Sequence, residues 1–377
     1  MFTRLLSSFA RHFTISIIAI MVVALFVLVT VNVSFLNPIA RTLKEFSISD
    51  FYFQALQSTA SPDTCRAITI VDMTELHDRC LIAKCMQQIE SLEPKVLGVD
   101  IVFEGLKDIE GDNILEKTAL SYDNAIFSYR LLNYDINQHQ YTREIHSFFA
   151  DSIKENEGFT NFQRTLYSGI KRDLSFSCHS KGQQISSFVK LITNSYAEKN
   201  YCPKEGELRI NFTPTYFTRI RYDSVLMNED LIKDRIVIFG STSEESDMHY
   251  TPLGKMAGTE LLSYAINTLL TERNIHQLPI WLFVPFTFLL VLFTQLWQDV
   301  YERKVDSINI QLIRSFMASS VVLVFTTFLW MVFLMWIGFM AFYYFQLNLN
   351  MGWALSAMAF VDGARSFYDT CIQSLRK

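Results

Sequence analysis

Carboxylate side chains follow three apolar segments of this chain at the places where buried strands would end. Asp72 closes the segment AITIVD, Asp100 lies near the end of VLGVDIVF, and Asp247 stands in the loop after RIVIFG. Ligand sites of open α/β sheets form outside the carboxyl ends of the strands. We therefore expect a site for a cation or a polar ligand, lined by five residues: Asp72, Asp100, Glu104, Asp247 and Thr251.

The same carboxylates also have a purely structural interpretation. Aspartate side chains commonly cap helices and tie loops together by accepting hydrogen bonds from backbone N–H groups. A buried cluster of like charges is unfavourable unless it is protonated, paired or metal-bound. Tight convergence would therefore argue for a ligand. No Cys/His spacing typical of zinc is present, and we expect neither a cofactor nor a metal centre.

A catalytic alternative rests on Ser241, Asp247 and His249, which lie close together in the sequence. Such proximity does not make a triad, and the chain has no G-x-S-x-G elbow, no H-E-x-x-H helix and no P-loop. We therefore expect no enzymatic activity, with an extracytoplasmic hydrolase as the enzyme alternative.

The cysteines could form disulfides if most of the chain lies outside the cytoplasm. Cys80 and Cys85 share a helical stretch but point in different directions, so we expect Cys178 to pair with Cys202 and Cys65 with Cys80 or Cys85. In the alternative, all of these thiols stay reduced and buried.

The elements that position these side chains alternate between buried strands and amphipathic helices. Residues 67–72 and 96–103 read as strands, and residues 81–92 between them place their apolar side chains on one helical face. A strand, a helix and a strand of this length form a right-handed crossover, so the two strands are neighbours or near neighbours in a parallel sheet.

The pattern continues with a helix from about Asp112, strands at 125–128 and 235–240, and a helix at 258–270. Residues 131–207 show no clear period, and we expect helices and loops there that cover the sheet. The fold class is therefore α/β, with an extracytoplasmic sheet of parallel strands and flanking helices, plus four transmembrane helices.

Half of the residues are hydrophobic although 19% are charged, so the apolar residues must be segregated. Residues 14–36 carry no charge and are long enough to span a bilayer. A cleaved signal peptide with Arg4 and Arg11 as its basic region is the rival interpretation. The run is too long for it, and no clean A-x-A site follows.

Three further spans are expected near the C-terminus: residues 278–297, 315–345 and 351–367, with an outer turn at 346–350. In the last one, Asp362 and Arg365 are expected to meet on one helix face. Four spans place all the flanking basic residues on one side of the membrane, as the positive-inside rule requires. Residues 1–13, 298–314 and 368–377 are then cytoplasmic, and residues 37–277 form the extracytoplasmic domain.

Several segments resemble the second type of CHASE domain, an extracellular sensing module associated with cyclases and histidine kinases. DFYFQ at Asp50 looks like its opening segment, and AITIVDM and PKVLGVDIVFEG look like its first two strands with their acidic ends. The similarity is most specific over RINFTP, YDSVL and RIVIFGSTSEESDMHYTPLGKMAGTELLSYAINTLL, and it covers nearly the whole chain. The resemblance implies a sensor with one span before the domain and usually three after it, here in a bacterial inner membrane.

The chain departs from the family pattern in three places. The first strand ends in VDM where a second acidic residue is frequent, Tyr264 stands where a histidine is common, and no effector follows the last span. If the family's logic holds, output passes to a separate partner that docks on residues 298–314 and the tail, or through the span bundle itself. The expected partners are the lipid bilayer, that partner protein and a second copy of the chain, but no nucleic acid.

Two other functions compete with sensing. A transporter or channel is disfavoured because the spans carry almost no ionisable residue at mid-depth. A structural subunit of a membrane complex, whose outer domain binds another protein, stays open.

Overall fold

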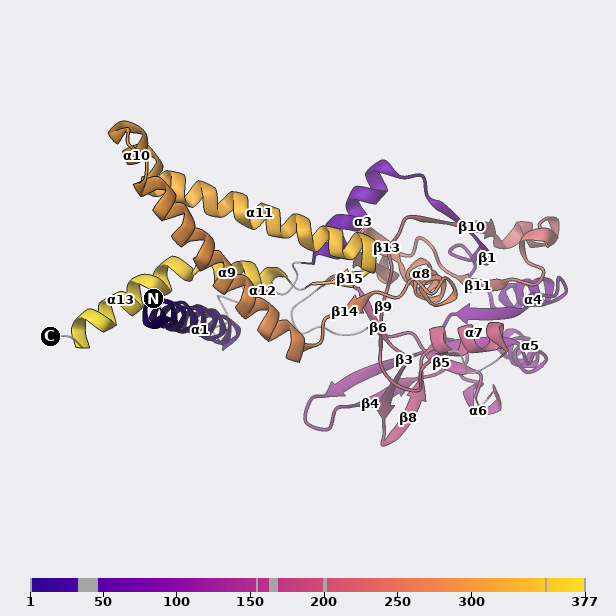
Figure 1. Cartoon of the computed structure of the whole chain (residues 1–377). Coiled ribbons are helices and arrows are strands. Elements are labelled where there is room, and N and C mark those ends of the chain that lie inside the picture. The colour runs from indigo at the N-terminus through magenta and orange to yellow at the C-terminus, as the bar shows by residue number, and fades with distance from the viewer. Residues whose placement is uncertain are drawn as a thin grey trace. The chain divides into compact units, whose positions relative to one another are not determined.

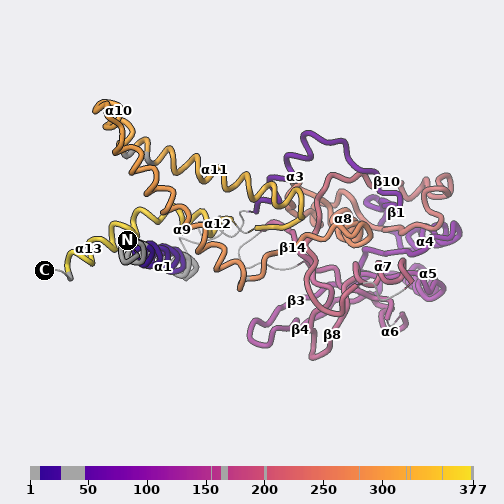
Figure 2. The backbone as a smooth tube through the Cα atoms, in the orientation of Figure 1, coloured from indigo at the N-terminus to yellow at the C-terminus, as the bar shows by residue number. Residues whose placement is uncertain are grey.

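The computed structural model describes residues 2–32, 47–153, 155–162, 169–198, 202–349 and 351–375. The chain divides into two compact units. The helical unit comprises Met1–Tyr52, Leu166–Ser168 and His276–Lys377, and the sheet unit comprises Phe53–Thr165 and Gly169–Ile275. Figures 1 and 2 show the path of the chain through each unit.

Five parallel strands form the centre of the sheet unit in the order β10-β1-β11-β2-β3. All five residues of β11 are buried, as expected for a parallel strand covered on both faces. Because β11 lies between β1 and β2, the two strands of the predicted crossover are near neighbours. The strands span β1 (Asp63–Asp72), β2 (Val96–Asp100), β3 (Ala125–Asp135), β10 (Thr215–Arg221) and β11 (Ile236–Gly240).

Helices cover both faces of this sheet (Figure 1). On one face Val99 and Phe239 belong to a core cluster with the buried side chains of α4 and α5. On the other face α7 contacts β2, and α8 contacts β1 and β11. Gly98 permits the approach of α7, because a Cβ atom there would lie 2.6 Å from Ile192 Cδ1. The helices are α4 (Arg79–Glu90), α5 (Ile109–Leu120), α7 (Phe188–Ala197) and α8 (Gly258–Leu270).

The expectation of helices and loops over residues 131–207 holds for α7, which covers one face of the sheet, but the region also adds strands to the sheet. β3 continues to Asp135 and pairs antiparallel with β4, and β7 and β8 extend the sheet beyond β4. The strands are short and their side chains are mostly half-exposed, so no alternation of apolar residues marks them. They span β4 (Gln140–Ile145), β5 (Glu157–Phe159), β6 (Asp173–Ser175), β7 (Ser177–Ser180), β8 (Gln183–Ser186) and β9 (Glu207–Arg209).

The remaining elements of the sheet unit are small. A hairpin follows β11 and leads directly into α8. These elements are α6 (Ala150–Ile153), η2 (Tyr222–Met227), η3 (Glu229–Leu231), η4 (Glu245–Asp247), β12 (Met248–Thr251) and β13 (Gly254–Ala257).

Among the described residues of the helical unit, three helices are long and apolar enough to cross a membrane: Phe9–Phe26, Trp281–Asp306 and Val324–Phe345. The expectation of four such helices was wrong. Residues 351–367 fall in two shorter helices, α12 and α13, and the second of them is largely polar. The helices are α1 (Phe2–Asn32), α3 (Ile48–Thr59, which continues into the sheet unit), α9 (Ile280–Asp306), α10 (Gln311–Met317), α11 (Ser320–Phe345), α12 (Met351–Ala359) and α13 (Val361–Leu375).

The chain reverses after α11. Gln346 adopts a left-handed conformation with φ of 50°, and β15 (Leu347–Asn348) then pairs with β14 (His276–Gln277). The outer turn predicted at residues 346–350 falls here, although residue 350 lies outside the described residues. So do residues 33–36 of the first predicted span.

Candidate functional site

Three strands of the central sheet end at one edge, and the predicted acidic residues lie there. Asp72 on β1 and Asp100 on β2 are both register partners of Gly240, which ends β11 between them. A Cβ atom on Gly240 would lie 2.4 Å from Thr259 Oγ1. Glycine at this position therefore lets the first turn of α8 approach the strand ends closely.

Asp72 ties two loops together at this edge. Its Oδ1 accepts hydrogen bonds from the Thr74 N–H at 3.0 Å, the Thr74 hydroxyl at 2.6 Å and the Thr242 N–H at 3.2 Å. Burial alone would raise the pKa of Asp72, but these hydrogen bonds together outweigh burial and lower it. Asp72 thus ties loops together by accepting backbone N–H groups, as the structural interpretation of these carboxylates expects.

Glu104 and Thr251 are engaged with their own neighbours. The Glu104 carboxylate lies 2.7 Å from Arg130 NH2, and both side chains are about half exposed. The buried Thr251 hydroxyl donates to the Gly254 carbonyl oxygen at 2.9 Å and accepts the Leu253 N–H at 3.2 Å, which closes the hairpin turn. Glu104 is therefore held by an ion pair with Arg130, and Thr251 by the turn of its own hairpin.

Asp100 and Asp247 are the two predicted residues that the structure brings together, at the start of α8. Asp100 Oδ2 accepts a hydrogen bond from Thr259 Oγ1 at 2.8 Å, and the Asp247 carboxylate would lie 2.5 Å from a Cβ atom on Gly258. Burial, followed by the charge of Asp247, raises the pKa of Asp100 to about 7. The pair therefore carries less than two full negative charges near neutral pH.

The Ser241, Asp247 and His249 side chains do not form a catalytic relay. His249 Nε2 lies 3.6 Å from Asp247 Oδ1, whereas Ser241 Oγ lies 3.1 Å from Thr74 Oγ1 and accepts the Glu244 N–H. The serine thus faces the Asp72 loop and not the histidine. Within the described residues, no group of three or more His, Cys, Asp or Glu side chains is arranged to hold a metal ion.

All six cysteines are free thiols in this structure. Cys65 lies in β1, Cys85 in α4 and Cys178 in β7, while Cys202 follows α7 and donates its N–H to Asn194. The predicted partners therefore sit on separate elements. Burial raises the pKa of Cys85 and of Cys178 to about 12, which keeps both thiols protonated and unreactive at neutral pH.

A pocket beside His146 was not predicted from the sequence. Its volume is about 460 Å³, and it is lined by His146, Ser147, Phe148, Ala150, Asp151 and Glu157. The imidazole of His146 stacks on Tyr129 with ring centres 4.5 Å apart. Its Nδ1 lies 2.7 Å from Glu157 Oε2 and its Nε2 lies 3.4 Å from Glu144 Oε2.

These two carboxylates control the charge of His146. The hydrogen bond with Glu157 is the largest cause that raises the pKa of His146, and it outweighs the opposing effect of burial. Glu144 in turn lies 2.7 Å from Lys181 Nζ. No motif marks this cluster in the sequence, because its members come from β3, the end of β4, β5 and the turn before β8.

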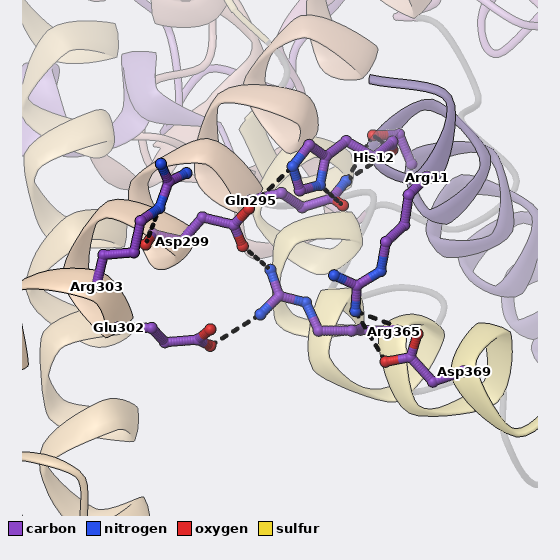
Figure 3. A network of polar contacts seen from close by, with 9 residues as sticks. Arg11, His12, Gln295, Asp299, Glu302, Arg303, Arg365 and Asp369 are labelled. Carbon is purple, nitrogen blue, oxygen red and sulfur yellow. Dashed lines mark hydrogen bonds and ion pairs between the residues drawn. The ribbon is translucent and has the colours of Figure 1, made fainter. Parts of the chain in front are cut away.

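The helical unit contains a polar network that joins α1, α9 and α13 (Figure 3). His12, Ser16 and Gln295 are almost completely buried. Gln295 Nε2 donates to the His12 carbonyl oxygen at 3.1 Å and to Ser16 Oγ at 2.7 Å, and its Oε1 lies 3.3 Å from His12 Nδ1. His12 Nε2 lies 3.0 Å from Asp299 Oδ2.

Asp299 lies between His12 and Arg365 in this network (Figure 3). Arg365 NH2 is 2.9 Å from Asp299 Oδ1, and its NH1 is 2.9 Å from Glu302 Oε1. The expectation that Arg365 meets Asp362 was therefore wrong. Arg365 reaches across to α9, because α9 continues as a helix to Asp306, beyond the predicted end of the span at residue 297.

The chain combines a mostly parallel sheet, covered by helices, with three helices that are long and apolar enough to cross a membrane. This is the architecture of a membrane-anchored α/β protein. Residues 19–297 match the CHASE2 domain, and the chain belongs to this family, whose members are extracellular sensory domains. The resemblance seen in the sequence is thus confirmed. No curated protein and no solved structure matches the chain.

Proposed function

We propose that the chain is a membrane sensor whose sheet unit binds a ligand outside the cytoplasm and whose helices pass the event to a separate cytoplasmic protein. The match to the CHASE2 domain carries this proposal. The helices at both ends of the sheet unit supply the membrane anchor. We assign the protein to the cytoplasmic membrane of a bacterium and give it a binding role without catalysis.

Both termini are proposed to lie on the cytoplasmic side. Three long helices alone would place them on opposite sides, but α12 and α13 lead the chain back along α1. Phe26 contacts Phe360 with ring centres 6.2 Å apart, and Arg11 lies 2.8 Å from Asp369. The start of α1 and the end of α13 therefore lie near the last turns of α9, which carry Arg303 and Lys304, two basic residues that the positive-inside rule assigns to the cytoplasm.

The proposed path inward begins at the Asp247 loop. This loop packs on Gly258 at the start of α8, and only residues 271–279 separate α8 from α9. A change in the Asp100 and Asp247 pair would displace α8, and the short connection would transmit this displacement to α9. Small shifts of packed helices are one way in which proteins switch between two conformations.

Cysteine crosslinking between α1 and α9 tests this path. The rings of Phe13 and Phe288 lie 5.1 Å apart, so cysteines at both positions can be joined by a short bifunctional thiol reagent. In a background without the native cysteines, we expect Asp247→Asn to change the crosslinking rate at least about twofold, because removal of its charge relieves the repulsion on Asp100.

The matched control is Glu245→Gln in the same loop, whose side chain is exposed and lies 3.5 Å from Lys255. This variant should leave the crosslinking rate unchanged. Equal rates in the wild type and in the Asp247→Asn chain would show that the loop and the membrane helices are not coupled.

The partner is proposed to dock on α10, which lies between α9 and α11 in the sequence. Leu312 and Phe316 on this helix are 81% and 66% exposed, and Arg314 adds a positive charge. Photo-crosslinking from position 312 in intact cells should trap a cytoplasmic protein in amounts that fall with Phe316→Ala. Recovery of lipid alone or of a second copy of the chain would contradict this docking surface.

A further inference from the structure

We propose that the pocket beside His146 binds a small organic cation, an amine whose ammonium group is held by Glu157 and Asp151. The inference rests on the proposed sensing function and names the chemical class of its ligand. The pocket differs from the strand-end residues that the sequence singled out, and its contacts all lie within the sheet unit.

The pocket is built on fixed backbone at the rim of the central sheet. The Ser147 hydroxyl accepts the Phe103 N–H at 3.1 Å, and the Phe148 N–H donates to the Phe103 carbonyl oxygen at 3.0 Å. These bonds fasten the pocket wall to the loop that follows β2. Arg79, whose guanidinium lies 5.0 Å from the centre of the Phe148 ring, donates to the carbonyl oxygens of Glu104 and Gly105 in that loop.

One carboxylate oxygen of Glu157 receives no hydrogen bond. Its side chain is only 6% exposed and lines the pocket, and its Oε2 contacts His146. Its Oε1 is buried without any hydrogen-bond partner. A buried carboxylate oxygen without a donor is unfavourable, so a group that brings an N–H to it stabilises the site.

The charge around the pocket favours a cation over a neutral ligand. Among the described residues that line or adjoin the pocket, the basic side chains are His146 and Lys181, against the three carboxylates of Glu144, Glu157 and Asp151. Asp151 is exposed and has no ion pair with any residue that the structure describes. The local surplus is therefore negative, and an ammonium group entering between Asp151 and Glu157 would balance it.

The size and the apolar lining limit the ligand further. A volume of about 460 Å³ lies within the range of small-molecule sites. Phe148 and Ala150 offer an apolar wall beside the carboxylates. A short alkyl chain that ends in an ammonium group meets both requirements.

Direct titration of the full chain in lipid nanodiscs tests the proposal. The probes are putrescine and butylamine, with 1,4-butanediol as the matched compound that has hydroxyls in place of ammonium groups. Calorimetry should show saturable binding of both amines and none of the diol. Glu157→Gln keeps the shape of the side chain but removes its charge, and it should weaken amine binding about tenfold or more.

Two further variants make the result specific. Asp151→Asn, on an exposed side chain that leaves the fold intact, should weaken binding about threefold. Glu110→Gln, at an exposed carboxylate outside the pocket, should leave the affinity unchanged. Absence of saturable amine binding, equal binding of the diol, or unchanged affinity in both pocket variants would overturn the proposal. If amines fail to bind while Asp247→Asn still changes the α1 to α9 crosslinking rate, the sensing function stands and only the ligand class is wrong.

Discussion

Asp72 and Asp100 occupy the same edge of the sheet on either side of Gly240, yet their surroundings act on them in opposite ways. Asp72 accepts two backbone N–H groups and a hydroxyl, which stabilise its charged form. Asp100 accepts a single hydroxyl and lies near the charge of Asp247, so its neutral form is favoured. The number of donors at each position separates a structural carboxylate from one that can respond to its environment.

Replacement of Asp100 by asparagine should stabilise the sheet unit at neutral pH. The pKa of Asp100 in the folded protein is about 7, above its ordinary value of 3.8, so the folded state loses stability as the pH rises from about 4 to 7. Asp100→Asn stays neutral, and its free energy of unfolding should exceed that of the wild type by about 2 kcal/mol or more above pH 7. Hydrogen exchange of peptides from β2 and β11 at pH 4.5, 6 and 8 measures this difference.

Asp72→Asn is the matched control and should act in the opposite direction. The pKa of Asp72 is lowered, so its charged form contributes stability above its ordinary pKa, and removal of the charge should increase exchange at pH 8. Similar shifts in the two variants would contradict the assignment of different roles to these aspartates.

The residues at the strand ends could be predicted from the sequence, but the side chains that they contact could not. Asp72 and Asp100 could be placed at one edge because Asp72 closes a short apolar run and Asp100 lies near the end of another, a local signal. Which carboxylates meet depends on where α8 begins relative to the sheet, which is a tertiary property. His146 and Glu157 could not be found, because they lie on half-exposed segments without periodicity.

The last turns of α9 lie at the centre of the polar network in the helical unit. Asp299 contacts both His12 on α1 and Arg365 on α13, and the Asp299 and Arg365 side chains are 16% and 15% exposed. Removal of one member of a poorly hydrated ion pair leaves its partners without compensation. The network therefore holds three helices together at one end of the helical unit.

Asp299→Ala should destabilise the helical unit by about 2 to 4 kcal/mol, because both His12 and Arg365 lose an acceptor. All five tryptophans lie between residues 281 and 353, so thermal unfolding followed by tryptophan fluorescence reports on this unit alone. Asp369→Ala breaks the more exposed pair with Arg11 and should cost less than about 1 kcal/mol. Equal shifts in the two variants would show that Asp299 does not organise the network.

The elements themselves were predictable where the signal is local and strong. β11 is a continuous apolar run, and α8 begins and ends as expected because its apolar face repeats with helical spacing. The strands after β3 were missed because both of their faces are partly exposed. The position of α13 could not be predicted, because ion pairs between Arg365 and α9 determine it. No local pattern in residues 361–375 indicates a contact with α9.

On the scale of the whole molecule, the chain combines an extracellular type of sensory domain with helices that anchor it in a membrane. The proposed topology places the sheet domain outside the membrane and the C-terminal residues in the cytoplasm. Two native thiols report on this arrangement: Cys80 is half-buried on α4 of the sheet unit, and Cys371 is exposed on α13.

Labelling of single-cysteine chains with a membrane-impermeant maleimide in intact spheroplasts measures this topology. The chain that retains Cys80 should be labelled in intact spheroplasts, and the chain that retains Cys371 should be labelled only after lysis. Labelling of Cys371 in intact spheroplasts, or protection of Cys80 until lysis, would contradict the proposed topology.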